Sequence, residues 1–507
     1  MSLKTQISVV LINPNLMAQR NDPFTTGIIY MPLGLAYLAA VLRQEGFDVK
    51  VIDAFAHRPE QIKLTEKNII FGLKAEEMLR LFPIDVKAIF IYAMNIANHV
   101  PALRLVSAVR SAYPTLPIII VENTQAVTAY SLRVVMGQFF EAGADYVITG
   151  ESEFRVKKLM RYILSARQLS ANDELEGVGS PNWYLPPKED YGNLDSLPFP
   201  AWDLFPLENY WKMRFGHSPI TAERYLPMLT SRGCPYPCRF CVIPATNQRK
   251  WHGRSAVNVV DEMESLMKTY QVQEFHWEDV DATVSEKRIC EICSEILRRR
   301  LEVTWKLGSG IKIETLRNEE TLALMAKAGC RYISISPESG SEKMLKAMRK
   351  PFNMQHAVRM VKRMSQEDIA TQACFILGFP GESDEDRRKT WDLVKTLTRQ
   401  GVDEVALFII TPLPGAEIYE EMSGYRTLSE LTFSPTWRED YPTLNRFRFK
   451  LYLAFLFWKL WYHPIRLLQQ PLRFFQRKYR TKMEMVPYRA LMFQWMICKA
   501  TVLQIQR

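Results

Sequence analysis

Blocks of apolar residues along the first part of the chain alternate between two spacings, one typical of strands and one typical of helices. Short apolar runs bounded by turn residues predict buried strands, and longer segments with apolar residues every three or four positions predict helices. The strands are expected at residues 6–12, 47–54, 88–92, 117–121 and 146–149, and the helices at residues 31–45 and 101–112. This alternation predicts a doubly wound α/β sheet, in which ligands bind at the carboxyl ends of the strands.

The same alternation resumes at Tyr225. Strands are expected at residues 225–231, 274–277, 303–308, 332–336, 374–378 and 405–410, and helices at residues 257–270, 285–299, 318–328 and 341–348. These strand and helix units predict a partial (β/α)6 barrel with its functional groups at the carboxyl ends of the strands. Between the two α/β parts, the chain is rich in Pro, Asn, Asp and Ser and predicts an irregular connector. The expected domains are residues 1–165, a connector at 166–220, the barrel at 221–440 and a helical tail at 441–507.

Three of the eight cysteines, Cys234, Cys238 and Cys241, stand at CxxxCxxC spacing in a turn rich in Gly and Pro. Their thiolates can converge on a soft metal centre, which suits an iron–sulfur cluster or zinc. A four-iron cluster held by three cysteines leaves one iron open to a small molecule. The alternatives are a zinc knuckle or a reduced loop. The remaining cysteines are scattered, which is not a disulfide framework and fits a reducing cytoplasm.

The cysteine loop resembles the cluster loop of the radical S-adenosylmethionine (SAM) enzymes. Those enzymes share the CxxxCxxC spacing and an aromatic residue before the last cysteine, here Phe240. The resemblance implies that the three cysteines hold a [4Fe–4S] cluster whose open iron chelates SAM. In that family an electron from the cluster, replaced by an external reductant, cleaves SAM to a 5′-deoxyadenosyl radical. Phe240 would lie beside the adenine.

Further positions at the ends of the barrel strands resemble SAM-binding positions of the same family. Glu278 follows the second strand, where the family commonly has a carboxylate for the SAM ammonium group. The segment PESGS at residues 337–341 resembles the element that contacts the SAM ribose, and CFILGFPGE at residues 374–382 resembles the strand that reads adenine. The resemblance therefore implies SAM contacts from Glu278, Ser309, Glu338, Ser339, Ile376 and Gly378. Glu278 could instead be a solvated strand end, and Ser339 could be a helix cap.

The N-terminal part resembles the cobalamin-binding domain that precedes the radical domain in one class of these enzymes. The resemblance lies in the NPN turn at residues 13–15, the helix MPLGLAYLAAVL and the GESE segment at residues 150–153. It implies a Rossmann-like domain with cobalamin contacts from Asn13, Pro14, Tyr37, Glu122, Thr124, Gly150 and Glu151. The Asp-x-His-x-x-Gly signature of many cobalamin proteins does not occur in the sequence, which implies cobalamin bound without a protein imidazole. A Rossmann-like domain without its cofactor is the alternative.

Positive charge is concentrated at the C-terminus. Residues 446–507 contain 13 Lys or Arg and one acid, so the rest of the chain is nearly neutral although the formal net charge is +10. This location argues against a nucleic-acid partner. Residues 447–462 carry eight aromatic residues among basic ones, and their longest uncharged run, Leu451–Trp458, is too short to span a bilayer. The tail is expected either to lie on an anionic membrane surface or to cap the barrel.

Together these features predict a radical SAM enzyme that uses a [4Fe–4S] cluster, SAM and cobalamin. Its expected reaction is methylation of an unactivated carbon of an apolar or lipid-like small molecule. A radical oxidative cyclase or carbon–carbon coupling enzyme is the first alternative, and a cobalamin or redox sensor without catalytic activity is the second. The N-terminus lacks the pattern of a signal peptide, so a cytoplasmic location, with possible contact to a membrane surface, is expected.

Overall fold

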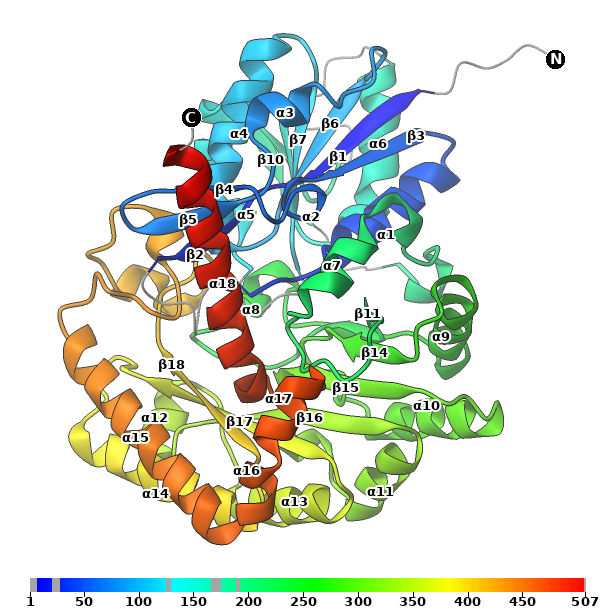
Figure 1. Ribbon diagram of the computed structural model, residues 1–507. Helices are drawn as coiled ribbons and strands as arrows, with labels where there is room; N and C mark the ends of the chain where they lie inside the picture. The colour runs from blue at the N-terminus through cyan, green and yellow to red at the C-terminus, as the bar shows by residue number, and fades with distance from the viewer. Residues whose placement is uncertain (1–6, 21–27, 125–128, 166–174, 188–191, 506–507) are drawn as a thin grey trace.

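A computed structural model describes residues 7–20, 28–124, 129–165, 175–187 and 192–505, with side chains to residue 499. Figure 1 shows two α/β domains, one above the other, and a run of C-terminal helices in orange and red that extends along both. The elements follow one another in the expected order of a doubly wound sheet, a partial barrel and a helical tail.

The first domain is built on a seven-stranded sheet in the order β10-β9-β8-β7-β6-β1-β3. Its parallel strands are β1 (Ser8–Asn13), β3 (Asp48–Asp53), β6 (Ala88–Ala93), β7 (Ile118–Glu122) and β8 (Tyr146–Ile148). Its long helices are α1 (Leu33–Gln44), α4 (His99–Ala112), α5 (Leu132–Glu141) and α6 (Ser152–Leu164). Strands β1 and β6 are buried at every position, which is the burial of a parallel sheet covered on both faces. The doubly wound sheet predicted from the sequence is confirmed.

The strand order of this sheet reverses beside β1. The parallel strands lie in the order β3-β1-β6-β7-β8, so the chain first extends to one side of β1 and then to the other. In such sheets ligands bind in the crevice at the carboxyl ends of the strands that flank the reversal. Asn13 ends β1 and Pro14 follows it, so both residues lie at this crevice.

Part of the stretch expected to be a connector belongs to the first sheet. The hairpin of β9 (Val178–Ser180) and β10 (Trp183–Leu185) extends the sheet beyond β8. Strands of three residues are too short to show a periodic pattern in the sequence. The remaining short elements of this half are β2 (Leu16–Gln19), β4 (Ile62–Leu64), β5 (Asn68–Phe71), α2 (Ala54–His57), α3 (Ala75–Leu79) and α7 (Leu207–Met213).

The second domain is a partial barrel of six parallel strands that neighbour one another in chain order. They are β11 (Tyr225–Met228), β14 (Glu274–Trp277), β15 (Thr304–Ile311), β16 (Cys330–Glu338), β17 (Ala370–Leu377) and β18 (Glu404–Ile409). The helices are α9 (Ala256–Tyr270), α10 (Glu286–Arg298), α11 (Glu319–Lys327), α12 (Glu342–Ala347), α13 (Met354–Gln366) and α14 (Asp384–Gln400). The expected partial (β/α)6 barrel is confirmed. Buried polar side chains also connect neighbouring strands. Lys306 Nζ of β15 lies 2.8 Å from Glu274 Oε1 of β14.

The tail consists of α15 (Tyr441–Tyr462), α16 (Pro464–Leu468), α17 (Gln470–Gln476) and α18 (Lys482–Ile505). One face of α15 packs on the barrel, where Leu451 and Phe455 are fully buried. Helix α18 then extends back to the first domain, and the ring of Phe493 lies 5.1 Å from that of Phe71. The tail thus packs against both domains from one side. Among the described helices, none is both long enough and apolar enough to cross a membrane.

Candidate functional site

The three cysteines lie in the loop that joins β12 (Ser231–Gly233) to its antiparallel partner β13 (Trp251–Gly253). All three are free thiols and partly buried, and Cys241 N donates a hydrogen bond to Cys238 O at 3.2 Å. Gly233 precedes Cys234 with a φ of +77°, and a Cβ on it would lie 2.0 Å from the carbonyl oxygen of Lys250. Glycine is therefore required for the hairpin to turn into the cysteine loop.

The chemistry of this donor set fits a metal cluster. Burial is the largest cause that raises the pKa of each thiol, and it raises the pKa of Cys241 to about 12. The charges of the neighbouring cysteines raise the pKa of Cys234 and Cys241 further. The thiolate forms of these cysteines are therefore stable only next to positive charge. A bound metal ion supplies this charge and takes the place of the thiol protons.

Among the described residues, no three His, Cys, Asp or Glu side chains lie close enough to share one metal ion. The ligands of a four-iron cluster bind separate iron atoms and do not need to meet at one point. The cysteine loop therefore fits the cluster expected from its spacing.

A buried ion pair lies beside the cysteine loop. Glu338 ends β16 with a φ of +63°, a rare conformation for a residue with a side chain, and its Oε1 lies 2.5 Å from Lys350 Nζ. Lys350 Nζ also lies 5.7 Å from the centroid of the Phe240 ring. Burial lowers the pKa of Lys350, but Glu338 and the thiols of Cys238 and Cys234 outweigh burial and raise it. The loop is therefore flanked by a fixed cation, which no motif in the sequence indicated.

Glu278 follows β14 and pairs with a histidine from the connector. Its Oε2 lies 2.6 Å from His217 Nδ1, and the Tyr30 ring lies 4.8 Å from the His217 ring. Burial raises the pKa of Glu278, but its interactions with His217, His276 and Lys482 outweigh burial, so the pKa is lowered and the carboxylate stays charged. The adjacent Asp279 accepts hydrogen bonds from Thr230 and has a structural role. Glu278 is thus the member of the acidic pair that can accept hydrogen bonds from a ligand.

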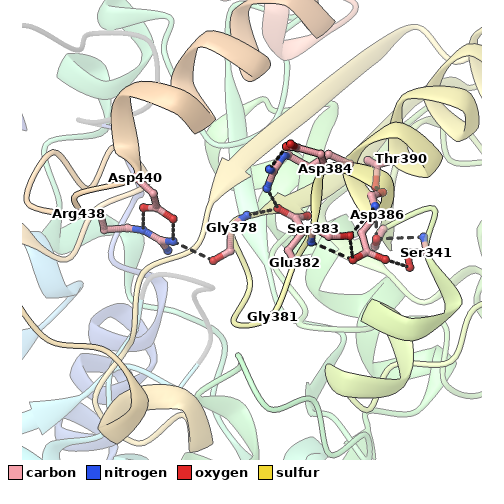
Figure 2. A network of polar contacts seen from close by, with 12 residues as sticks. Ser341, Gly378, Gly381, Glu382, Ser383, Asp384, Asp386, Thr390, Arg438 and Asp440 are labelled. Carbon is pink, nitrogen blue, oxygen red and sulfur yellow. Dashed lines mark hydrogen bonds and ion pairs between the residues drawn. The ribbon is translucent and has the colours of Figure 1, made fainter.

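Backbone groups at the exit of β17 are already bonded. Figure 2 shows that Gly378 donates a hydrogen bond from its N to Glu382 at 2.7 Å, and its O accepts one from Arg438 at 3.0 Å. Ile376 is buried within β17. A ligand in this region would contact a loop that is fixed in place by two charged side chains.

The two predicted serines differ in their surroundings. Ser309 lies in a stretch of β15 where the register shifts between Leu307 and Ile311, and it is partly exposed. Ser339 is fully buried, and its Oγ lies 3.3 Å from the hydroxyl of Thr390 on α14. Both remain predicted SAM contacts, and Ser309 is the more accessible.

The crevice of the first sheet holds a cavity of about 20 Å³ lined by Asn13, Pro14, Phe55 and Tyr30, among others. Asn13 Oδ1 is buried there without a hydrogen-bond partner among the described residues, although its Nδ2 donates to Asp53. An unpaired buried acceptor suits a ligand with N–H groups, such as the amide-rich corrin of cobalamin. The cavity is smaller than a corrin. The residues at 21–27 and 125–128, which follow β2 and β7, lie outside the described residues.

Other residues predicted to contact cobalamin have structural partners. Glu122 accepts hydrogen bonds from Leu132 N at 2.6 Å and from Gly150 N at 2.5 Å, and burial raises its pKa to about 7. It therefore ties the ends of β7 and β8 to the start of α5. Thr124 is buried at the same edge.

Glu151 and Tyr37 face the barrel domain through Arg232. The guanidinium of Arg232 lies 3.3 Å from Glu151 and 2.8 Å from Glu153, and it stacks 5.2 Å above the Tyr37 ring. Arg232 stands two residues before Cys234, so this network joins the first domain to the cysteine loop. This network could not be predicted from the sequence, because Arg232 is a single arginine outside any recognised motif.

A second cavity, of about 150 Å³, lies where the first domain, the connector, the barrel and the tail meet. Its lining includes His217, Gln372 of β17, Glu404 of β18, and Lys482 of α18. Ile28 and Tyr30 line both this cavity and the one at the sheet crevice, so the two cavities adjoin. This chamber thus lies between the two domains and is lined by both.

Comparison with known proteins identifies the second domain. Residues 228–394 match the model of the radical SAM superfamily. The chain is 27% identical over 87% of its length to an uncharacterized methyltransferase of Pyrococcus horikoshii, covering 88% of that protein. It is 26% identical to cytidylyl-2-hydroxyethylphosphonate methyltransferase of Streptomyces wedmorensis, over 85% of each chain. It is also 25% identical to the anaerobic magnesium-protoporphyrin IX monomethyl ester cyclase of Rubrivivax gelatinosus, over 77% of this chain and 66% of that one.

The fold as a whole has a solved counterpart. The radical SAM methyltransferase TsrM of Kitasatospora setae, solved with cobalamin and a [4Fe–4S] cluster, matches with a TM-score of 0.61 at 18% identity. The match covers 83% of this chain and 76% of that one, so it spans both α/β domains and shows that the fold is shared. The cysteine loop lies within the matched family region, at the entrance of the barrel. This chain therefore contains a radical SAM domain.

Proposed function

We propose that the protein is a cobalamin-dependent radical SAM enzyme that transfers a methyl group to an unactivated carbon of a small molecule. The observation that carries this proposal is the pair of adjoining cavities, one at the crevice of the first sheet and one beside the barrel. A substrate between them would reach a methyl donor on one side and a radical source on the other. The relatives named methyltransferases support the same reaction.

When bound, a [4Fe–4S] cluster with SAM supplies a 5′-deoxyadenosyl radical, and methylcobalamin supplies the methyl group. Cys234, Cys238 and Cys241 would hold three of the irons. Glu338 and Glu278 would accept hydrogen bonds from SAM, because both carboxylates follow or end a barrel strand, Glu338 buried and Glu278 partly exposed. The loop at Gly378 would place the adenine, since its backbone is fixed by Arg438 and Glu382.

Asn13 and Pro14 would contact cobalamin at the crevice, where the unpaired acceptor of Asn13 lies. Tyr30 would separate the two reactive centres, because its side chain lines both cavities. Burial of the surrounding side chains excludes water from the radical. The chain's own task is thus to hold the centres in order and keep them dry.

The test uses anaerobically reconstituted protein with SAM, cobalamin and a one-electron reductant. We expect 5′-deoxyadenosine, which forms even without the natural substrate, and bound cobalamin in the visible spectrum after desalting. The Cys238→Ala variant should lose 5′-deoxyadenosine, and the Cys290→Ala variant, changed at a helical cysteine, should keep it. Absence of 5′-deoxyadenosine from the wild-type protein would refute the radical chemistry, and absence of bound cobalamin would refute the methyl donor.

A radical oxidative cyclase is the second candidate, and the similarity to a magnesium-protoporphyrin ester cyclase favours it. SAM labelled with deuterium in its methyl group separates the two reactions. A methyltransferase places the label in its product, whereas a cyclase product carries none.

We further propose that the substrate is apolar or lipid-like and that the enzyme works in the cytoplasm at a membrane surface. The eight free cysteines suit a reducing compartment. The cavity between the domains has mainly apolar side chains, including Phe408, Phe433 and Met485, which suit an apolar substrate.

A further inference from the structure

The helices of the tail expose an unusual amount of apolar surface. Eleven of the sixteen large apolar side chains that are exposed among the described residues lie between residues 449 and 495. They are Phe449, Leu453, Phe457, Leu460, Trp461, Ile465, Leu468, Leu472, Phe475, Leu491 and Trp495. We call these residues the tail face. Single exposed apolar residues are ordinary, but a group of this size marks a surface that contacts something apolar.

Helix α15 is apolar on two opposite sides. Leu451 and Phe455 are buried against the barrel, so one side is explained by packing. Leu453, Phe457 and Trp461 follow at intervals of four on the other side, where they are 52%, 63% and 74% exposed. A surface helix needs only one apolar side to pack on its domain. The second side therefore requires another partner.

The tail face continues from α15 into the helices that follow. Ile465 on α16, Phe475 on α17 and Trp495 on α18 are each at least 60% exposed. Figure 1 shows these helices as a continuous orange to red path along the molecule. An open groove of about 700 Å³ between α7, α17 and α18 is bordered by Phe475, Leu491 and Trp495. The groove thus shares three side chains with the tail face.

The exposed charges of the tail segment itself are all positive, and Glu60 of the first domain borders the groove. Arg446, Lys450, Arg477, Lys478 and Lys499 are exposed in the same segment. Its one acid, Glu484, is buried and lies 3.1 Å from Arg473. Exposed aromatic residues with basic neighbours fit the headgroup region of a bilayer that contains anionic lipids. A second copy of the chain would bring like charges together.

We propose that the tail face docks on the surface of an anionic lipid bilayer without crossing it. The aromatic and aliphatic side chains enter the boundary between headgroups and acyl chains, and the Lys and Arg side chains contact lipid phosphates. The groove between α7, α17 and α18 then lies at the bilayer surface, where an acyl chain can enter it. This inference goes beyond the proposed reaction, since binding to lipid does not depend on SAM cleavage.

The test is sedimentation of the full-length reconstituted protein with phosphatidylcholine vesicles, with and without phosphatidylglycerol. We expect at least tenfold stronger binding to the vesicles with phosphatidylglycerol, and weaker binding at high salt. Leu453→Ser/Phe457→Ser should weaken binding by at least tenfold. The matched control, Ile84→Ser/Val134→Ser, changes two exposed apolar residues of the first domain and should bind like the wild type. Arg446→Gln/Lys450→Gln should lose about fivefold for each charge removed, on anionic vesicles alone.

Three results would overturn the proposal. They are absence of vesicle binding, equal binding by the tail-face variant and its control, and self-association of the protein that the tail-face variant abolishes without vesicles present. Iron content and 5′-deoxyadenosine formation, measured on the same samples, show that the variants are folded. These two measurements also distinguish failure of the docking proposal from failure of the proposed chemistry.

Discussion

The network around Arg232 allows a quantitative test of how the two domains are joined. The Arg232 side chain is 3% exposed, and its partners Glu151 and Glu153 are 0% and 4% exposed. Arg232→Met would leave two buried carboxylates without their cation. Removal of one partner from a buried ion pair costs about 3–5 kcal/mol of unfolding free energy. His252, 3.4 Å from Glu151, can compensate only part of this loss.

The loss should depend on pH in a defined direction. In the wild type, burial raises the pKa of Glu151, but Arg232 and His252 outweigh burial and lower it. Without Arg232 the burial effect dominates, so the pKa rises and the carboxyl group binds a proton in the folded state. Stability of the variant then falls as the pH rises, because the unfolded state releases that proton more readily. The difference between Arg232→Met and the wild type is therefore larger at pH 8 than at pH 6.

The assay is urea unfolding of the reconstituted protein, followed by circular dichroism. Arg58→Met is the control, since Arg58 and Glu60 form an exposed pair at 4.0 Å that contributes about 1 kcal/mol or less. Adding Glu151→Gln and Glu153→Gln to Arg232→Met should restore part of the lost stability. The reasoning would be refuted if Arg232→Met unfolded at the same urea concentration as Arg58→Met.

Three further predictions concern single positions. Cys238→Ala should lower the iron content and visible absorbance of the reconstituted protein, whereas Cys290→Ala should not; an intact cluster in the first variant would contradict the ligand assignment. The buried carboxyl of Glu122 has its pKa raised from 4.5 to about 7, so its contribution to stability is present below pH 4.5 and lost as the pH rises through 7. Glu122→Gln should remove a decline of about 3 kcal/mol between pH 4.5 and pH 8, measured by urea unfolding, and parallel pH profiles would disprove it. Gly378→Ala adds a Cβ 2.9 Å from an Arg438 nitrogen at a φ of +74°, so it should lower the free energy of unfolding by about 1 kcal/mol or more. It should also weaken SAM binding, measured by equilibrium dialysis. Unchanged SAM affinity would argue against a SAM contact at this loop.

The sequence predicted the two sheets well because parallel strands buried on both faces are continuous apolar runs. The strand at residues 88–92 and the strand at 117–121 each match the structure to within one residue at either end. The hairpin of β9 and β10 was missed, since its strands have three residues each and lie in a polar segment. Local pattern therefore identifies long elements and not short additions to a sheet edge.

The candidate site was predicted only where a motif carries it. The cysteine loop is confirmed as part of a radical SAM domain because its spacing is distinctive. Lys350 and Arg232 lie next to that loop in the structure, but their partners are 12 and 79 or more residues away in the sequence. Pairs formed by tertiary contacts leave no local pattern. For the same reason the sequence could not show that the side chains of Glu122 and Tyr37, predicted to contact cobalamin, form hydrogen bonds with Leu132 and Glu262.

For the tail, the sequence left barrel capping and membrane contact as alternatives. The structure shows that one side of α15 caps the barrel and that the other side is exposed. The sequence could not separate the two alternatives, because a helix that is apolar on two sides can pack on the protein with one side and on a second partner with the other.

Strand β18 is the last strand of the barrel sheet, so its outer edge needs protection from other chains. Helix α15 lies along this edge, and Leu407 N of β18 donates a hydrogen bond to the Tyr452 hydroxyl at 3.1 Å. The tail thus occupies the position that a further strand would fill in a closed barrel. A chain shortened before Tyr441 would leave β18 open to strand addition, and aggregation through sheet growth, rather than simple loss of binding, would be its main defect.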